Sequence, residues 1–412
     1  MVAVWILLAI VVALLAAWVG RRVAAALRLP GVIGEICVGL ALGPLTVAAT
    51  GWHGGGTPLD GIRTGLTLIG QAAVILYLMN LAHDVRRSLN SRKIAETARV
   101  TLVSVLVSLA AGVALAAIVI LDGEPELRGT ATSATFILYS AIAMGVTAAP
   151  VLARIINERG MTGSSAARIS FAAAVLSDAI AWLLLAVALG LNSGRPAGVI
   201  VAAAAAAGGV LLAWGARGAA RRLSAWSARR PGLAATLAGT AALAAGFASE
   251  SLGLTVIFGA CLAGLALPRR GTSQWDAAVA TTARCAKPFL PLFFVATGLT
   301  VFANGVGAVP WGIAFATVAL GVLGKFGGGY LGGRLGAQPP LDSARIGAML
   351  NTRGLTELII LQAGHQTGIL ATRLFLAFLV MALATTAVTG PLLALLDRVE
   401  ARRNRVTAES FG

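Results

Sequence analysis

The sequence predicts an all-α polytopic membrane protein, and three observations lead to that fold class. Of its 412 residues, 58% are hydrophobic and only 12% are charged, and the mean hydropathy is +0.87. Such a composition is typical of a chain whose solvent is mostly lipid. Apolar runs of about 20 residues, the length that crosses a bilayer, recur from one end of the chain to the other. Basic residues gather in every second connection between these runs.

Hydropathy divides the chain into roughly 13 such spans. The first six are expected at 2–20, 31–49, 65–82, 100–121, 132–156 and 170–190. A seventh run, 197–215, is built largely of Ala and Gly and is expected to form a linker helix. The last six are expected at 232–249, 252–268, 288–304, 311–333, 344–363 and 372–396. The first run lacks a preceding basic segment and an obvious cleavage site, so we expect a retained helix and not a signal peptide.

Six spans, a linker and six further spans suggest two repeats that insert with opposite topology, as in many secondary transporters. We therefore expect a transmembrane domain over 1–397. Repeat one would cover 1–190, the linker helix 197–215 and repeat two 232–397. Residues 398–412 would form a short basic cytoplasmic tail.

The formal net charge of +16 could indicate a nucleic-acid partner, but the distribution of the charges favours the lipid bilayer. Most of the 32 Lys and Arg fall in alternate connections. Examples are Arg21, Arg22 and Arg28, then Arg221, Arg222, Arg229 and Arg230, and finally Arg398, Arg402 and Arg403. By the positive-inside rule these residues mark the cytoplasmic side. The sequence thus predicts a multi-pass plasma-membrane protein with its N-terminus outside and its C-terminus in the cytoplasm.

Nothing in the sequence suggests an enzyme, a resident cofactor or a metal site. The three cysteines, Cys37, Cys261 and Cys285, have no metal-binding spacing and lie in spans or on the predicted cytoplasmic side. Catalytic nucleophile motifs and phosphate-binding loops are missing as well. Ionisable groups inside the spans instead favour a transport function.

Asp178 is the most informative residue, because it lies in the middle of the apolar run 168–187. A charged side chain near the bilayer centre costs about 2.5–3.5 kcal/mol on insertion scales, so its default interpretation is an ion or proton site. Lys325 and Glu357 lie at comparable depth in two other spans. A carboxylate and an ammonium from separate spans could together bind and release a cation and a proton.

Two spans carry polar residues that interrupt a helix at membrane depth. In the fifth span Pro150 removes a backbone donor and should free the carbonyls around Met144 to Thr147, where a cation could bind. Irregular backbone at this depth also predicts a cavity beside Asp178. The alternative is a simple proline kink without a ligand. The twelfth span carries Asn351, Thr352 and Arg353, with Glu357 one turn beyond.

Three stretches resemble the monovalent cation:proton antiporters of the second cation:proton antiporter family, which includes Kef-type potassium efflux systems and plant cation/proton exchangers. They are Gly31–Pro44 with its Gly-Glu and Gly-Pro pairs, Thr147–Arg154 followed by Leu176–Trp182, and Gly347–Leu361. The likeness extends over nearly the whole chain. It implies a sodium/hydrogen exchanger domain with two broken crossing helices, alternating access and a homodimer.

The resemblance also implies roles for particular residues. Asp178 matches the aspartate that exchanges a proton for a cation, and Ser177 stands where electrogenic relatives carry a second Asp. One carboxylate in place of two favours electroneutral one-for-one exchange. Lys325 matches a lysine that pairs with that missing acid, so it must pair with Asp178, bind carbonyls at a broken helix, or remain uncharged. The resemblance also implies that Asn351, Thr352 and Arg353 contact the cation or the facing half-helix.

Some alternatives stay open at this level. Arg353 and Glu357 could simply neutralise each other, because they lie four residues apart on one helical face. Glu35, near the predicted cytoplasmic end of its span, is either a gate or a packing residue. The protein could also be a passive ion-conducting pseudo-transporter, or an efflux carrier for a small organic cation or metabolite. The choice between Na⁺ and K⁺ cannot be read from the residues.

Overall fold

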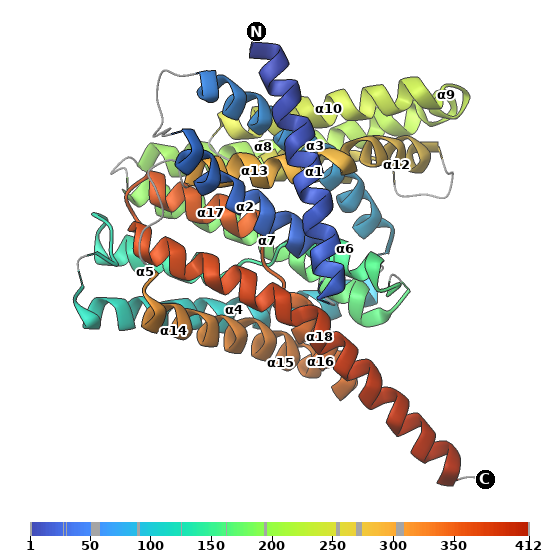
Figure 1. The fold of residues 1–412 in the computed structure, drawn as a ribbon. Helices are drawn as coiled ribbons and strands as arrows, with labels where there is room; N and C mark the ends of the chain where they lie inside the picture. Colours follow the sequence, from blue (N-terminus) through green and yellow to red (C-terminus); the bar gives the residue numbers. More distant parts are fainter. Residues whose placement is uncertain are drawn as a thin grey trace. The chain divides into compact units, whose positions relative to one another are not determined.

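The computed structural model describes residues 2–27, 29, 31–50, 58–88, 91–124, 126–161, 163–192, 196–252, 256–268, 274–301 and 309–410. These residues form helices joined by short connections, which confirms the all-α class (Figure 1). The chain divides into two compact units, each built from separate stretches. Unit one comprises Met1–Arg21, Gly34–Leu89 and Trp182–Val306, and unit two comprises Arg22–Ile33, Asn90–Ala181 and Gly307–Gly412.

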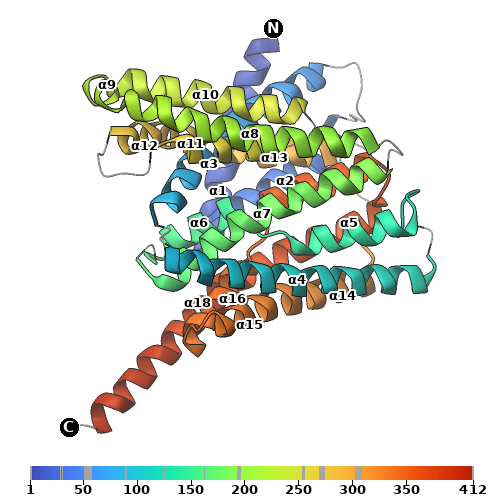
Figure 2. The same cartoon turned by 180° about the vertical axis from the view of Figure 1, so that it is seen from behind.

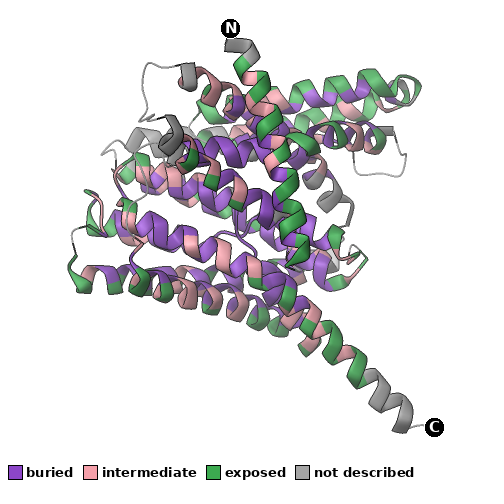
Figure 3. Ribbon diagram, viewed as in Figure 1, coloured by how far each residue is buried: buried purple, intermediate pink, exposed green. Residues whose placement is uncertain are grey.

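Unit one is arranged around the long helix α3. Its helices are most of α1 (Val2–Ala26) and α2 (Gly31–Thr50), with α3 (Pro58–Ser88), α8 (Pro196–Arg222), α9 (Ser224–Arg229), α10 (Pro231–Ser251), α11 (Val256–Ala266), α12 (Gln274–Ala286) and α13 (Leu290–Val301). Helix α3 packs against α11, α12 and α13. Ala13 of α1, Leu66 of α3 and Leu292 of α13 meet in one apolar cluster of buried side chains. The outward side of α1 exposes Trp5, Leu7 and other apolar side chains, as a lipid-facing helix does (Figure 3).

Unit two carries the interrupted helices. It contains α4 (Ser91–Asp122), α5 (Ser133–Gly145), α6 (Ala149–Glu158), α14 (Trp311–Val322), a π-helical turn (Leu323–Gly327), α15 (Gly328–Leu335), α16 (Pro340–Leu350), α17 (Leu355–Gln366) and α18 (Thr372–Ser410). Helix α7 (Ser165–Asn192) belongs to this unit as far as Ala181 and continues into unit one. Helices α4, α14 and α15 pack together, as Figure 2 shows from behind.

Glycines allow α15 to lie very close to its neighbours. A Cβ added at Gly328 would sit 3.0 Å from the backbone of Ser104 on α4, and one at Gly329 would sit 2.8 Å from the backbone of Gly347 on α16. Small residues that permit such close approach are typical of helix pairs inside membranes. The segment that carries Lys325 is therefore fixed between two other helices.

Each expected span contains helix, while α9 and α12 lie outside the expected spans. Two expectations need comment. Among the described residues, seven helices are long and apolar enough to cross a membrane by length and composition, so the count of 13 spans and the two inverted repeats stay predictions. Helix α18 extends to Ser410 and so runs into the tail expected at 398–412, whose place in the cytoplasm stays a prediction. Its Arg, Glu and Ala residues are good helix formers, which explains the continuation.

Candidate functional site

The first interruption lies between α5 and α6. Helix α5 ends at Gly145, Val146 and Ala148 adopt extended or irregular dihedral angles, and α6 begins at Ala149. Pro150 occupies the first turn of α6. A proline is tolerated there because its missing N–H would have no partner within the helix in any case. The break that the sequence predicts in the fifth span is thus confirmed.

The second interruption lies between α16 and α17. Helix α16 ends at Leu350, and α17 begins at Leu355. Gly354 has φ 149° and ψ −120°, a backbone conformation essentially restricted to glycine. The three residues before it, Asn351, Thr352 and Arg353, are buried. The break predicted in the twelfth span is confirmed as well.

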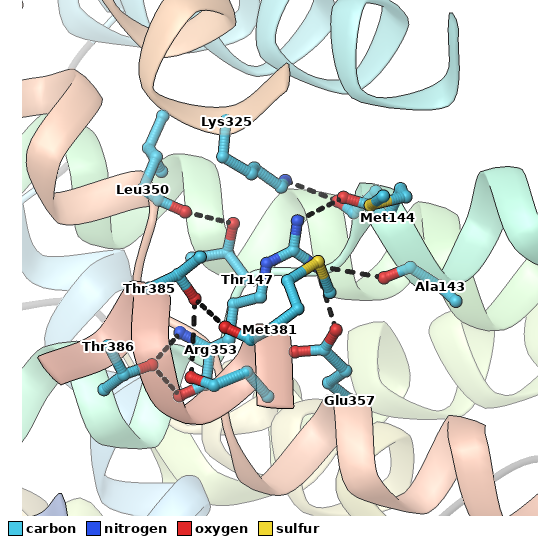
Figure 4. Close-up of polar contacts among 12 residues, drawn as sticks. Ala143, Met144, Thr147, Lys325, Leu350, Arg353, Glu357, Met381, Thr385 and Thr386 are labelled. Atoms are coloured by element: carbon cyan, nitrogen blue, oxygen red, sulfur yellow. Dashed lines mark hydrogen bonds and ion pairs between the residues drawn. The ribbon is translucent and has the colours of Figure 1, made fainter. Parts of the chain in front are cut away.

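The two interruptions lie against each other and share hydrogen bonds (Figure 4). The backbone N–H of Ala148 donates to the carbonyl of Thr352 at 3.0 Å. The hydroxyl of Thr147 donates to the carbonyl of Leu350, also at 3.0 Å. Backbone groups that a continuous helix would pair are therefore satisfied across the crossing, as burial in a membrane protein requires.

Positively charged side chains cover the carboxyl end of α5. The Arg353 guanidinium donates to the carbonyl of Ala143 at 3.1 Å and to that of Met144 at 2.9 Å. The Lys325 ammonium donates to the carbonyl of Gly145. The last carbonyls of a helix have no partner within it and carry a partial negative charge, so cations are stabilised there. The sequence predicted that a transported cation could bind the carbonyls of Met144 and Gly145. In the structure these carbonyls bind the side chains of Arg353 and Lys325.

Arg353 also forms an ion pair with Glu357, one turn further along α17. The two side chains are fully buried, and Arg353 Nη1 lies 3.0 Å from Glu357 Oε1. The other carboxylate oxygen, Oε2, has no hydrogen-bond partner among the described residues. The guanidinium thus connects the carboxyl end of α5 to the first turn of α17.

Lys325 is fully buried in the π-helical turn between α14 and α15. Of the three situations open to it from the sequence, the structure has the one in which the ammonium binds a carbonyl of a broken helix. Its charge is also near enough to those of Asp178, Arg353 and Glu357 for electrostatic interaction. Single π-helical turns within α-helices are frequent at functional sites.

Asp178 and Ser177 lie on the part of α7 that belongs to unit two. Asp178 is 5% exposed and Ser177 is 1% exposed. Within the described part of the chain, Asp178 Oδ1 and Ser177 Oγ have no hydrogen-bond partner. A buried carboxylate oxygen without a partner is costly. This oxygen is therefore available to bind a proton or a cation.

Glu35, the possible gate, belongs to unit one. Its side chain is 1% exposed, and its carboxylate lies 3.4 Å from the more exposed Arg21. The structure thus gives Glu35 an ion pair at the end of α1, while the other candidate residues gather in unit two. A role for Glu35 as a gate stays a prediction.

Sequence reasoning missed two residues of α18 that hold the second interruption in place. The Thr386 hydroxyl accepts a hydrogen bond from the Arg353 backbone N–H at 2.8 Å and donates to the Arg353 carbonyl at 2.9 Å. The carbonyl of Thr385 accepts from the Asn351 amide at 3.5 Å. The available signal was the run Ala-Thr-Thr-Ala-Val-Thr, which places three hydroxyls in an otherwise apolar span.

Comparison with known proteins decides the family. The sodium/hydrogen exchanger transmembrane family matches residues 10–396. The chain belongs to this family. It is 29% identical over 383 residues to cation/H⁺ antiporter 18 of Arabidopsis thaliana, covering 89% of this chain and 45% of the relative. It is 27% identical over 375 residues to the Na⁺/H⁺ antiporter NhaS4 of Synechocystis, covering 88% and 90% respectively.

A third relative is the K⁺/H⁺ antiporter 1 of Saccharomyces cerevisiae, 26% identical over 385 residues, covering 89% of this exchanger-family chain and 43% of the yeast protein. The chain thus spans about half the length of several relatives that it matches. Among solved structures, the sodium proton antiporter MjNhaP1 of Methanocaldococcus jannaschii has a similar fold, with a TM-score of 0.68 and 16% identity. That match covers 96% of this chain and 98% of MjNhaP1.

Proposed function

We propose that this exchanger-family protein is a secondary active antiporter that exchanges a monovalent cation, K⁺ or Na⁺, for protons. In this proposal Asp178 binds the proton and the cation in turn. The observation that carries it is the Asp178 carboxylate, which is buried and keeps one oxygen without a hydrogen-bond partner among the described residues. A carboxylate that cannot hold both ligands makes each of them displace the other, and this competition couples their movements.

The charges around Asp178 support one-for-one exchange. Lys325 interacts electrostatically with one basic side chain, Arg353, and with two acidic ones, Asp178 and Glu357, and all four are buried in unit two. With all four ionised, their formal charges cancel. Binding either a proton or a monovalent cation at Asp178 then gives the same total charge. The two loaded states are thus electrostatically alike, as a cycle that exchanges one proton for one monovalent cation without moving net charge requires.

The two interruptions that cross each other support the proposed site at Asp178. Arg353 and Lys325 bind the carboxyl end of α5, so they hold the first interruption in place, and Lys325 adds positive charge near Asp178. In the proposed cycle the hydroxyl oxygens of Thr147 and Ser177 contribute to the cation's coordination. Pro150, Asn351 and Thr352 maintain the irregular backbone, and Glu35 acts as a gate.

The relatives support the chemistry of the exchange without identifying the cation. Their names pair protons with sodium in one case, with potassium in another, and with an unspecified cation in the plant proteins. We further propose alternating access between the two sides of the membrane. The protein would act as a homodimer in the plasma membrane, with its N-terminus outside and its C-terminus in the cytoplasm.

Proteoliposome transport tests the proposal. A pH-sensitive dye reports the collapse of a proton gradient when Na⁺, K⁺, Li⁺ or choline is added. We expect an alkali cation to collapse the gradient with the unaltered protein, and Asp178→Asn to lower the rate to that of empty liposomes, because the amide cannot be deprotonated. Asp122→Asn is the matched control, since Asp122 is exposed at the end of α4 and should leave transport unchanged.

Three outcomes would overturn the proposal. Full exchange by Asp178→Asn would show that this carboxylate is not the shared site. Downhill cation flux that moves no protons and survives the substitution would identify a passive pseudo-transporter. A response to choline but not to alkali cations would identify a carrier of small organic cations.

A further inference from the structure

Unit one contains a large apolar groove that the proposed exchange does not use. It has a volume of about 630 Å³. Helices α8 and α10 form its two walls, and α11, which packs against both, forms its floor. The two walls run side by side in Figure 2. Gly209 lets α8 approach the floor, since a Cβ there would lie 2.6 Å from the side chain of Leu262 on α11.

The lining of the groove suits a hydrocarbon chain. On α8 it presents Gly208, Leu212, Ala216 and Ala220, which share one helical face, and on α10 the face from Leu237 to Ser249. Each stretch is about 18 Å long at the helical rise of about 1.5 Å per residue. One leaflet of a bilayer is about 15 Å of hydrocarbon, half the usual core of about 30 Å. The groove is therefore long enough for an acyl chain.

One end of the groove is strongly basic. Four exposed arginines, Arg221, Arg222, Arg229 and Arg230, surround the short helix α9 that connects the two walls. The sequence has no Asp or Glu between Asp178 and Glu250. Among the described residues, none of the ion pairs involves these four side chains. Their positive charge is thus left for an anion from outside the chain.

Trp275 holds the basic end of the groove in place. The indole is buried, lines the groove, and donates through Nε1 to the carbonyl of Ala220 at 3.1 Å. It thereby ties α12 to the last turns of α8. The indole therefore holds the arginine-bearing end of α8 against α12.

We propose that this groove binds one anionic phospholipid, with an acyl chain along the α8–α10 walls and its phosphate at the arginine cluster. Clusters of arginine beside a membrane favour anionic over zwitterionic headgroups. A second copy of the chain is a poorer occupant. A two-fold axis beside the groove and along the membrane normal would bring two such clusters next to each other, where like charges repel. The inference does not depend on the proposed exchange.

Native mass spectrometry of the purified protein tests this site. The measurement compares retention of phosphatidylglycerol and phosphatidylcholine of equal chain length. We expect phosphatidylglycerol to be preferred and Arg221→Gln with Arg222→Gln to weaken its binding roughly thirty-fold, the loss expected for two arginines near the headgroup. Arg398→Gln with Arg402→Gln, two exposed arginines of α18, is the matched control and should change nothing.

A second variant tests the apolar part of the site. Ala241→Phe with Ala245→Phe fills the groove from α10 and should abolish retention of both lipids while the protein remains monodisperse. Equal retention of the two lipids by the unaltered protein would overturn the proposal. So would an equal loss in the α18 control. A groove-filling variant that changes the oligomeric state but keeps its lipid would show that the occupant is a second copy.

Discussion

At the scale of single residues, the buried Arg353–Glu357 pair should be essential for stability. Both side chains are inaccessible, and the guanidinium also serves two carbonyls of α5. Removing one partner of a buried ion pair leaves an uncompensated charge and typically costs about 3–5 kcal/mol. We expect Arg353→Met or Glu357→Gln alone to lower the thermal unfolding temperature in detergent markedly. The double substitution should be less destabilising than the sum of the two.

The surface ion pair of Arg373 with Glu124 is the control for these single and double substitutions. Arg373 Nη1 lies 2.9 Å from Glu124 Oε2, as close as the atoms of the buried pair, but both side chains are partly exposed. Pairs of this kind contribute at most about 1 kcal/mol. Arg373→Met should therefore shift unfolding only slightly. Additive effects of Arg353→Met and Glu357→Gln would show that the pair does not act as a unit.

At the scale of elements, the second interruption depends on the backbone of one residue. Gly354 holds φ 149°, where a side chain is strained by on the order of 1–3 kcal/mol. We expect Gly354→Ala to destabilise the protein and to slow transport, because Arg353 and Glu357 flank this bend. Gly312→Ala is the control, since Gly312 lies in the exposed first turn of α14 with open space around it. Equal behaviour of the two variants in unfolding and transport would contradict this reasoning.

Local chemistry made both helix breaks predictable, but not the contacts that satisfy them. Pro150 indicates an interruption because a proline cannot donate to the helix, whatever surrounds it. Arg353 and Lys325 bind the carbonyls of Ala143 to Gly145 because three segments meet in space: the end of α5, the π-helical turn and the second interruption. Sequence spacing carries no information on that meeting, and the resemblance to the antiporter family implied such contacts only as one of several possibilities. The hydrogen bonds of Thr386 to Arg353 were missed for the same reason. Helix α18 packs against α16 in the fold, although the two are separate along the chain.

At the scale of the whole molecule, the compact units do not follow the two halves of the sequence. Each unit takes part of both predicted repeats, so unit two combines Asn90–Ala181 with Gly307–Gly412. The candidate exchange site draws on both of those stretches, through Asp178 and Thr147 from one and Lys325 and Arg353 from the other. Hydropathy finds spans one by one and cannot show which of them pack together. The arrangement places Asp178, Lys325, Arg353 and Glu357 in one unit.

That arrangement leads to a prediction for the complete transport cycle. If the loaded states with a proton and with a monovalent cation carry equal charge, each full cycle moves no net charge. Initial exchange rates in proteoliposomes should then differ less than about two-fold between zero and −100 mV, since the potential contributes about 2.3 kcal/mol per 100 mV only for each net charge moved. The potential must be clamped with an ion that the protein does not carry. A steep dependence on voltage would require a second exchangeable charge, and Glu357, with its unpartnered Oε2 in the described structure, would be the group to substitute next.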